Sequence, residues 1–204
     1  MIAIIDYDAG NLRSVQKALQ FIGEEVVITR DHDEIMNSGK VILPGVGAFG
    51  DAMQKLHSYH LINTIKEVAD CGKPLLGICL GQQLMFEGSE ESEGIEGLGL
   101  LPGKIIRIPE GGGLKIPHIG WNNLNITQGD SLYQDITGTP YVYFVHSYYL
   151  KSEDRSIVAA TTEYGTLIDA SVEKNNIYAC QFHPEKSGEI GLKILKNFAS
   201  LEER

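Results

Sequence analysis

Residues 73–83 read Lys73-Pro74-Leu75-Leu76-Gly77-Ile78-Cys79-Leu80-Gly81-Gln82-Gln83, and the rest of the predicted fold is arranged around them. An apolar run leads into a cysteine with a glycine two residues to either side, and a helix-like segment follows at 84–87. This is the cysteine form of the G-x-S-x-G nucleophile elbow, in which a buried strand turns sharply into a helix. Gly77 and Gly81 suit the turn because strand and helix pass too closely for a Cβ atom. The positive end of the helix dipole would favour a Cys79 thiolate.

The size and composition of the chain are those of a soluble globular domain. It has 204 residues, of which 43% are hydrophobic and 22% are charged, so we expect one domain over residues 1–204. The net charge of −10 argues against nucleic-acid binding, which needs a basic surface. No apolar run has the length of a membrane span or a signal peptide. The three widely spaced cysteines predict no disulfide framework and no metal site, and therefore a reducing compartment, the cytoplasm. No cofactor is expected.

The first half of the chain alternates short apolar strands with amphipathic helices. Strands are predicted at 2–5, 26–29, 41–43 and 75–78, and helices at 12–22, 33–37, 49–56 and 61–68. This alternation predicts a doubly wound, parallel sheet. The first strand ends at Asp6, at the carboxyl edge where α/β proteins bind ligands, and Asn11 is a good N-cap for the first helix.

The second half is rich in strands. They are predicted at 104–108, 115–121, 141–150, 156–162, 167–173 and 177–182, and a final helix follows Lys186. Turns separate several of these strands, which favours antiparallel pairing. We therefore predict an α/β, flavodoxin-like fold whose mostly parallel sheet is flanked by helices and carries additional antiparallel strands in the C-terminal half. The acidic run 90–93 is interpreted as a solvated loop.

A cysteine nucleophile needs a base to accept its proton, and His183 has the best setting among the six histidines. It follows a predicted strand and begins the sequence His183-Pro184-Glu185. Pro184 favours an extended backbone at His183, which places side chains two residues apart on the same side. Glu185 could then orient the imidazole. Either motif alone would favour a purely structural role, but Cys79, His183 and Glu185 together form a complete catalytic triad.

The motifs at 77–83 and 181–185 resemble those of the class I, triad-type glutamine amidotransferases, and the similarity covers nearly the whole chain. The resemblance implies that Cys79 attacks the side-chain amide of glutamine, that His183 protonates the departing ammonia, and that water cleaves the resulting thioester. It also implies an oxyanion hole built from the backbone, partly in the loop at 44–47. The residues implied for that hole are Val46, Gly47 and Leu80, and those implied for binding the amino-acid end of glutamine are Gln83, Ser147 and Tyr148.

Three further stretches, 6–15, 117–122 and 143–149, resemble the glutaminase subunit of imidazole glycerol phosphate synthase in histidine biosynthesis. Only one helix is predicted after the triad, so we expect the ammonia to be used on another polypeptide. The resemblance implies a heterodimer with a (βα)₈-barrel cyclase subunit, which makes imidazole glycerol phosphate and aminoimidazole carboxamide ribonucleotide. The residues expected to face this partner are Asn11, Trp121, Tyr143 and Lys186, although Trp121 would fit a core position equally well.

Several alternatives stay open at this point. The same triad would serve the glutaminase subunit of anthranilate or aminodeoxychorismate synthase, or a stand-alone γ-glutamyl hydrolase. A flavodoxin-like binding module is a non-enzymatic alternative, since fold does not fix function. His118 and His146 each adjoin a predicted functional loop and are either structural hydrogen-bonding residues or interface residues. Cys71 and Cys180 are predicted to be packing residues.

Overall fold

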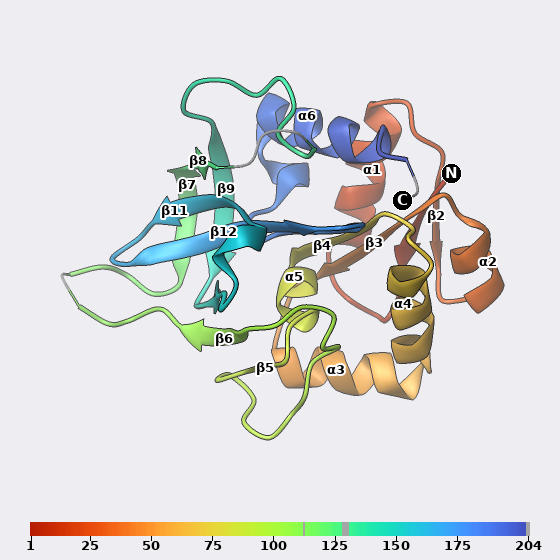
Figure 1. The fold of residues 1–204 in the computed structure, drawn as a ribbon, viewed down its shortest axis with the longest axis horizontal. Helices are drawn as coiled ribbons and strands as arrows, with labels where there is room; N and C mark the ends of the chain where they lie inside the picture. Colours follow the sequence, from red (N-terminus) through yellow and green to blue (C-terminus); the bar gives the residue numbers. More distant parts are fainter. Residues whose placement is uncertain (112, 128–130, 203–204) are drawn as a thin grey trace.

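The parallel half of a large central sheet forms the centre of the molecule (Figure 1). The computed structural model describes residues 1–111, 113–127 and 131–202. Five adjacent strands run parallel in the order β2-β1-β3-β4-β13. In chain order these are β1 (Ile2–Ile5), β2 (Val26–Thr29), β3 (Lys40–Gly45), β4 (Leu75–Cys79) and β13 (Ile177–Cys180). Their residues form a nearly continuous apolar run, as expected for strands that are covered on both faces.

Helices cover both faces of this parallel sheet. On one face, α1 (Leu12–Phe21) lies beside α6 (Gly188–Ala199), and the core there includes Val15, Ile194 and Phe198. On the other face lie α2 (His32–Asn37), α3 (Phe49–Ser58) and α4 (Leu61–Asp70), with Phe49 and Ile65 in the core. The predicted doubly wound α/β fold is therefore confirmed.

The second half extends the sheet with mainly antiparallel strands. Beyond β13 the order continues β12-β10-β6-β5, and β11 pairs with β12 and β8. These strands are β5 (Gly88–Ser89), β6 (Lys104–Arg107), β8 (Asn125–Ile126), β10 (Tyr148–Lys151), β11 (Val158–Glu163) and β12 (Leu167–Lys174). A separate antiparallel pair is formed by β7 (His118–Asn123) and β9 (Tyr141–His146). The pair lies beside the end of β13, because the His183 backbone N–H donates to the Tyr143 carbonyl at 2.9 Å.

Several boundaries differ from the sequence prediction. The stretch predicted as one strand at 141–150 is two strands, and Ser147 separates β9 from β10, which belong to different sheets. The strand predicted from 115 begins only at His118, after Pro117, which has no N–H to donate to a ladder. The strand predicted from 156 begins at Val158, because residues Arg155–Ile157 form a 3₁₀ turn that the Asp154 side chain caps. No helix within the described ranges has the length and apolarity to cross a membrane.

Candidate active site

Cys79 lies at a sharp turn between β4 and the short helix α5 (Leu80–Leu84). Its backbone has φ 54° and ψ −111°, an unusual conformation for a residue with a side chain. A Cβ atom on Gly81 would lie 1.8 Å from the Leu43 carbonyl oxygen, and one on Gly77 would lie 2.8 Å from the Gly81 oxygen. The structure thus contains the predicted elbow, and both glycine positions are too crowded for a Cβ atom. The predicted helical segment at 84–87 is wrong, since α5 ends at Leu84 and the next two apolar residues enter the core.

His183 and Glu185 meet Cys79 from the neighbouring strand. His183 follows β13 and precedes a 3₁₀ turn, Pro184–Lys186, so its backbone is extended, with φ −101° and ψ 96°. Its Nδ1 lies 2.8 Å from Glu185 Oε1, and both side chains are buried. His183 also hydrogen-bonds with the Cys79 side chain. The structure therefore brings the three predicted triad residues together in the predicted order.

The surroundings of His183 favour its charged form. Burial alone would lower the pKa of His183, but hydrogen bonds to Cys79 and Glu185 and the negative charge of these groups raise it to about 9. Because Nδ1 is bonded to Glu185, Nε2 is the nitrogen left to face the sulfur. An imidazolium in this position can donate a proton to a leaving group.

A cavity of about 300 Å³ opens at Cys79 and His183. Its lining includes all the residues implied for the oxyanion hole and for glutamine binding: Val46, Gly47, Leu80, Gln83, Ser147 and Tyr148. Gly47 has φ 106°, a conformation that favours glycine, and Val46 is 40% exposed. The loop between β3 and α3 thus reaches the cavity with a backbone that only glycine adopts easily. The roles of these residues stay predictions.

The loop between β1 and α1 packs against both the triad and the Val46 loop. Asn11 occupies the N-cap position, but its backbone is left-handed and its side chain makes no capping bond, so the predicted capping role is wrong. Its Nδ2 instead donates to Glu185 Oε1. The Tyr7 hydroxyl donates to the Pro44 carbonyl at 2.8 Å, and a Cβ on Gly10 would lie 2.7 Å from a Val46 methyl.

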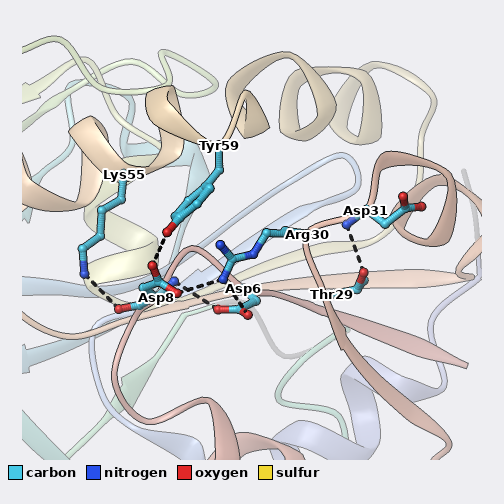
Figure 2. Close-up of polar contacts among 7 residues, drawn as sticks. All are labelled: Asp6, Asp8, Thr29, Arg30, Asp31, Lys55 and Tyr59. Atoms are coloured by element: carbon cyan, nitrogen blue, oxygen red, sulfur yellow. Dashed lines mark hydrogen bonds and ion pairs between the residues drawn. The ribbon is translucent and has the colours of Figure 1, made fainter.

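A polar cluster anchors the start of this loop (Figure 2). Arg30, which follows β2, pairs with Asp6 at 2.9 Å and with Asp8 at 2.8 Å, and its guanidinium lies 4.0 Å from the centre of the Tyr59 ring. From the C-terminal end of α3, the Tyr59 hydroxyl donates to the Asp8 carboxylate and Lys55 donates to the Asp8 carbonyl. The hydrogen bonds from Tyr59 and Arg30 lower the pKa of Asp8. Asp6, at the strand end where a ligand site was expected, is therefore paired with Arg30 of the same chain.

Of the four residues predicted to face a partner, Trp121 is 56% exposed, so the alternative core position is wrong for it. Its ring packs edge-on against Tyr143 at 6.1 Å between centroids. Lys186 lines the cavity itself, whereas the Asn11 side chain is engaged by Glu185. Ile119 and Tyr141 are also exposed, at 59% and 54%, so an apolar face lies on the β7–β9 pair beside the cavity.

Sequence reasoning missed the position of Glu91. The acidic run was interpreted as a solvated loop, yet Glu91 lines the cavity and its Oε2 accepts a hydrogen bond from the Phe49 backbone N–H at 2.8 Å. Nothing in the local pattern distinguishes Glu91 from its acidic neighbours, because its position depends on α3. Within the described ranges, no cluster of three or more His, Cys, Asp or Glu residues could hold a metal ion.

Two other interpretations of lone side chains are also settled by the structure. Cys71 is exposed, so its predicted packing role is wrong, whereas Cys180 is buried as predicted. His118 and His146 are both buried and hydrogen-bonded to each other, which favours the structural alternative over the interface one.

The comparison with protein families agrees with this geometry. The sequence profile of the family "Glutamine amidotransferase class-I" matches residues 3–201. The chain belongs to this family. Among its relatives is the imidazole glycerol phosphate synthase subunit HisH of Bacillus cereus, 52% identical over 203 residues, which cover 100% of this chain and 96% of the relative. The HisH subunit of Caldanaerobacter subterraneus is 51% identical and 98% of each chain is covered.

Solved structures show the same fold at low sequence identity. A crystal structure of a glutamine amidotransferase has a TM-score of 0.75 and 18% identity, covering 98% of this chain and 100% of that one. A structure of PurLQS from Thermotoga maritima has a TM-score of 0.73 and 20% identity, covering 97% and 96%. The class I architecture predicted from the two motifs is therefore confirmed.

Proposed function

We propose that this chain is a glutaminase subunit that hydrolyses glutamine through a cysteine thioester and supplies ammonia to imidazole glycerol phosphate synthase. The observation that carries the proposal is the meeting of Cys79, His183 and Glu185 at one cavity in an amidotransferase fold. Two full-length relatives at just over 50% identity carry the name of a subunit of that synthase, which favours this activity over an anthranilate or aminodeoxychorismate glutaminase.

The residues of the cavity fit the steps of amide hydrolysis. The Cys79 sulfur attacks the amide carbon of glutamine, and backbone N–H groups of Leu80 and the Val46–Gly47 loop stabilise the tetrahedral oxyanion. His183 Nε2 donates its proton to the departing nitrogen, so ammonia leaves and a γ-glutamyl thioester remains. His183, now neutral, removes a proton from water, which cleaves the thioester to glutamate and frees the thiol. Glu185 orients the ring throughout.

The ends of the cavity fit the remainder of the glutamine molecule. Gln83 donates through Nε2 to Tyr148 and Gln181, which leaves its Oε1 as an acceptor for the substrate's α-ammonium group. The Glu91 carboxylate lines the same cavity and supplies a negative charge for that ammonium. The three cysteines of the chain are free thiols, which suits a reducing compartment such as the cytoplasm.

The partner in this proposal is a (βα)₈-barrel cyclase subunit in a heterodimer. The exposed apolar side chains of Ile119, Trp121 and Tyr141 lie on the strand pair that contacts the backbone of His183 through Tyr143. A partner that covers this face would also surround the mouth of the cavity, at Lys186, and would receive the ammonia there. Large aromatic residues such as Trp121 are frequent anchors of protein interfaces.

A glutaminase assay with and without the barrel subunit and its bound nucleotide tests this proposal. We expect weak activity for the chain alone, strong activation in the complex, and loss of activity with retained glutamine binding in Cys79→Ala. If Cys79→Ala hydrolyses glutamine as fast as the unaltered chain, the proposed mechanism is wrong. If the isolated chain reaches the full rate of the complex, activation by the partner is wrong.

A further inference from the structure

A buried amide lies against the sulfur of Cys79. Gln181 follows β13 immediately, is fully buried, and its backbone N–H donates to the Ala170 carbonyl at 2.8 Å. Its side-chain Nε2 lies 3.7 Å from Cys79 Sγ. The Val145 carbonyl oxygen lies 3.8 Å from the same sulfur, which also interacts with His183. A thiol can donate to that carbonyl but a thiolate cannot, whereas an N–H donor at Gln181 would be strengthened when the sulfur becomes charged.

The neighbouring amide determines which end of the Gln181 side chain faces the sulfur. Gln83 Nε2 lies 3.0 Å from the Tyr148 carbonyl oxygen and 2.9 Å from Gln181 Oε1. The Tyr148 carbonyl can only accept, so it must face the nitrogen of Gln83. The second N–H of Gln83 then requires an oxygen of Gln181, which leaves the Gln181 nitrogen for Cys79. The amide orientation is thus set by a backbone carbonyl rather than by the sulfur.

A buried pair of histidines holds the Tyr148 carbonyl from its other side. His146 Nδ1 lies 2.9 Å from that carbonyl oxygen and therefore donates to it. His146 Nε2 is 3.0 Å from His118 Nδ1 and accepts from it if the pair is neutral. Burial lowers the pKa of His146 to about 3 and that of His118 to about 4, so both rings are neutral at physiological pH.

The His118 ring, at the far end of this series of hydrogen bonds, is held in place by packing. The His118 ring stacks on Tyr164 with 3.9 Å between centroids and on Phe144 with 4.8 Å. Because the Tyr148 carbonyl can only accept, the donor direction runs from His118 to His146 and on to that carbonyl, which also accepts from Gln83. Each side chain along this route is buried. Buried polar groups bonded in this way hold a single orientation. A flip of Gln83 would place its oxygen against two acceptor oxygens, and a flip of Gln181 would place its nitrogen against the nitrogen of Gln83.

We propose that Gln181 is a further catalytic residue, whose side-chain N–H donates to the Cys79 sulfur and stabilises it as a thiolate, and that His146 is a positioning residue which keeps Gln83 and Gln181 in this orientation. The inference rests on the proposed function, in which Cys79 is the nucleophile. It assigns the donor on the sulfur to an amide, in addition to the His183 imidazole.

The reactivity of the thiol tests the role of Gln181. We would measure the rate at which iodoacetamide alkylates Cys79 at pH 7, in a Cys71→Ala background because Cys71 is exposed. Gln181→Met has nearly the same volume without a donor, and we expect its alkylation rate to fall about tenfold, as for the loss of one hydrogen bond to a charged group. Gln181→Glu places an oxygen beside the sulfur and should be at least as slow. Wild-type alkylation rates in both variants would overturn the proposal.

The matched control is Ser171→Ala on the adjacent strand. Ser171 is fully buried and donates to the Ala179 carbonyl at 2.8 Å, so the variant loses a buried hydrogen bond away from the sulfur. We expect it to lower the melting temperature without changing the alkylation rate. If the rate falls as much in Ser171→Ala as in Gln181→Met, a general loosening of the sheet explains both and the proposal is wrong.

Two variants of His146 test the positioning role. Asparagine can place its Nδ2 where the histidine has Nδ1, so His146→Asn retains the donor to Tyr148, whereas His146→Leu does not. We expect His146→Leu to alkylate severalfold more slowly and His146→Asn to restore most of the rate. Equal rates in the two variants would overturn the role of His146. The proposed function has a separate test, because glutamine hydrolysis that survives in Cys79→Ala would refute it. The Gln181 and His146 variants test only the environment of the sulfur and leave Cys79 in place.

Discussion

The Glu185 carboxylate makes the candidate triad more than a cysteine–histidine pair. Its Oε1 accepts from both His183 and Asn11, and its Oε2 has no hydrogen-bond partner among the described residues although it is buried. A buried charge with so few partners is costly unless an opposite charge is nearby. The imidazolium of His183 is that charge, so Glu185, together with Cys79, raises the pKa of His183.

Glu185→Gln should therefore remove the charge while keeping the shape. We expect the pKa of His183 to fall from about 9 toward 6.5 and kcat to fall by about a hundredfold or more. A raised pKa stabilises the folded state below pH 6.5, and this contribution is lost as the pH rises through 9. Unfolding experiments should thus show a stability difference between the two proteins that narrows above pH 9. An NMR titration of the His183 ring measures the pKa directly.

Glu189→Gln is the matched control for this substitution. Glu189 is an exposed carboxylate in the first turn of α6, so the net charge changes equally while the triad is untouched. The pKa of His183 should stay near 9 in this variant. A Glu185→Gln protein that also titrates near 9 would show that Glu185 does not cause the raised pKa.

At the scale of elements, the elbow was predictable because its glycines are required by local geometry. The strand, the sharp turn and a helix starting directly behind Cys79 all follow from residues 75–81. The length of α5 did not follow, because residues 85 and 86 are apolar and buried and carry no local signal that a helix ends. The capping role predicted for Asn11 was wrong because the local sequence does not reveal its actual partner, Glu185, which is 174 residues away in the chain.

Gly81→Ala tests the close contact at the elbow. Its Cβ would lie 1.8 Å from the Leu43 carbonyl oxygen, so backbone must move, and we expect the free energy of unfolding to fall by about 3 kcal/mol. In Gly39→Ala the nearest atom would be 3.8 Å away, so we expect a change within about 1 kcal/mol. Urea titrations of both variants compare them. Equal stability of the two would show that strand and helix do not need a glycine here.

At the scale of the whole molecule, the meeting of Cys79, His183 and Glu185 was predictable, but the surroundings of these residues were not. The sequence indicated that Cys79 and His183 lie close together although they are far apart in the chain, because the strand ends of a parallel sheet meet at one edge. The position of Glu91 and the His118–His146 pair depend on how separate elements pack, which no local pattern records. The exposed face around Trp121 likewise emerged only from the pairing of β7 with β9.

The most direct test of the central claim is covalent labelling with an electrophilic glutamine analogue, the diazoketone 6-diazo-5-oxo-L-norleucine, followed by peptide mass mapping. We predict an adduct on the peptide that contains Cys79, its suppression by excess glutamine, and no labelling of the exposed Cys71 or the buried Cys180. Cys79→Ser should remain unlabelled. Labelling at another residue, or continued labelling and glutamine hydrolysis in Cys79→Ser, would contradict the assignment of Cys79 as the nucleophile.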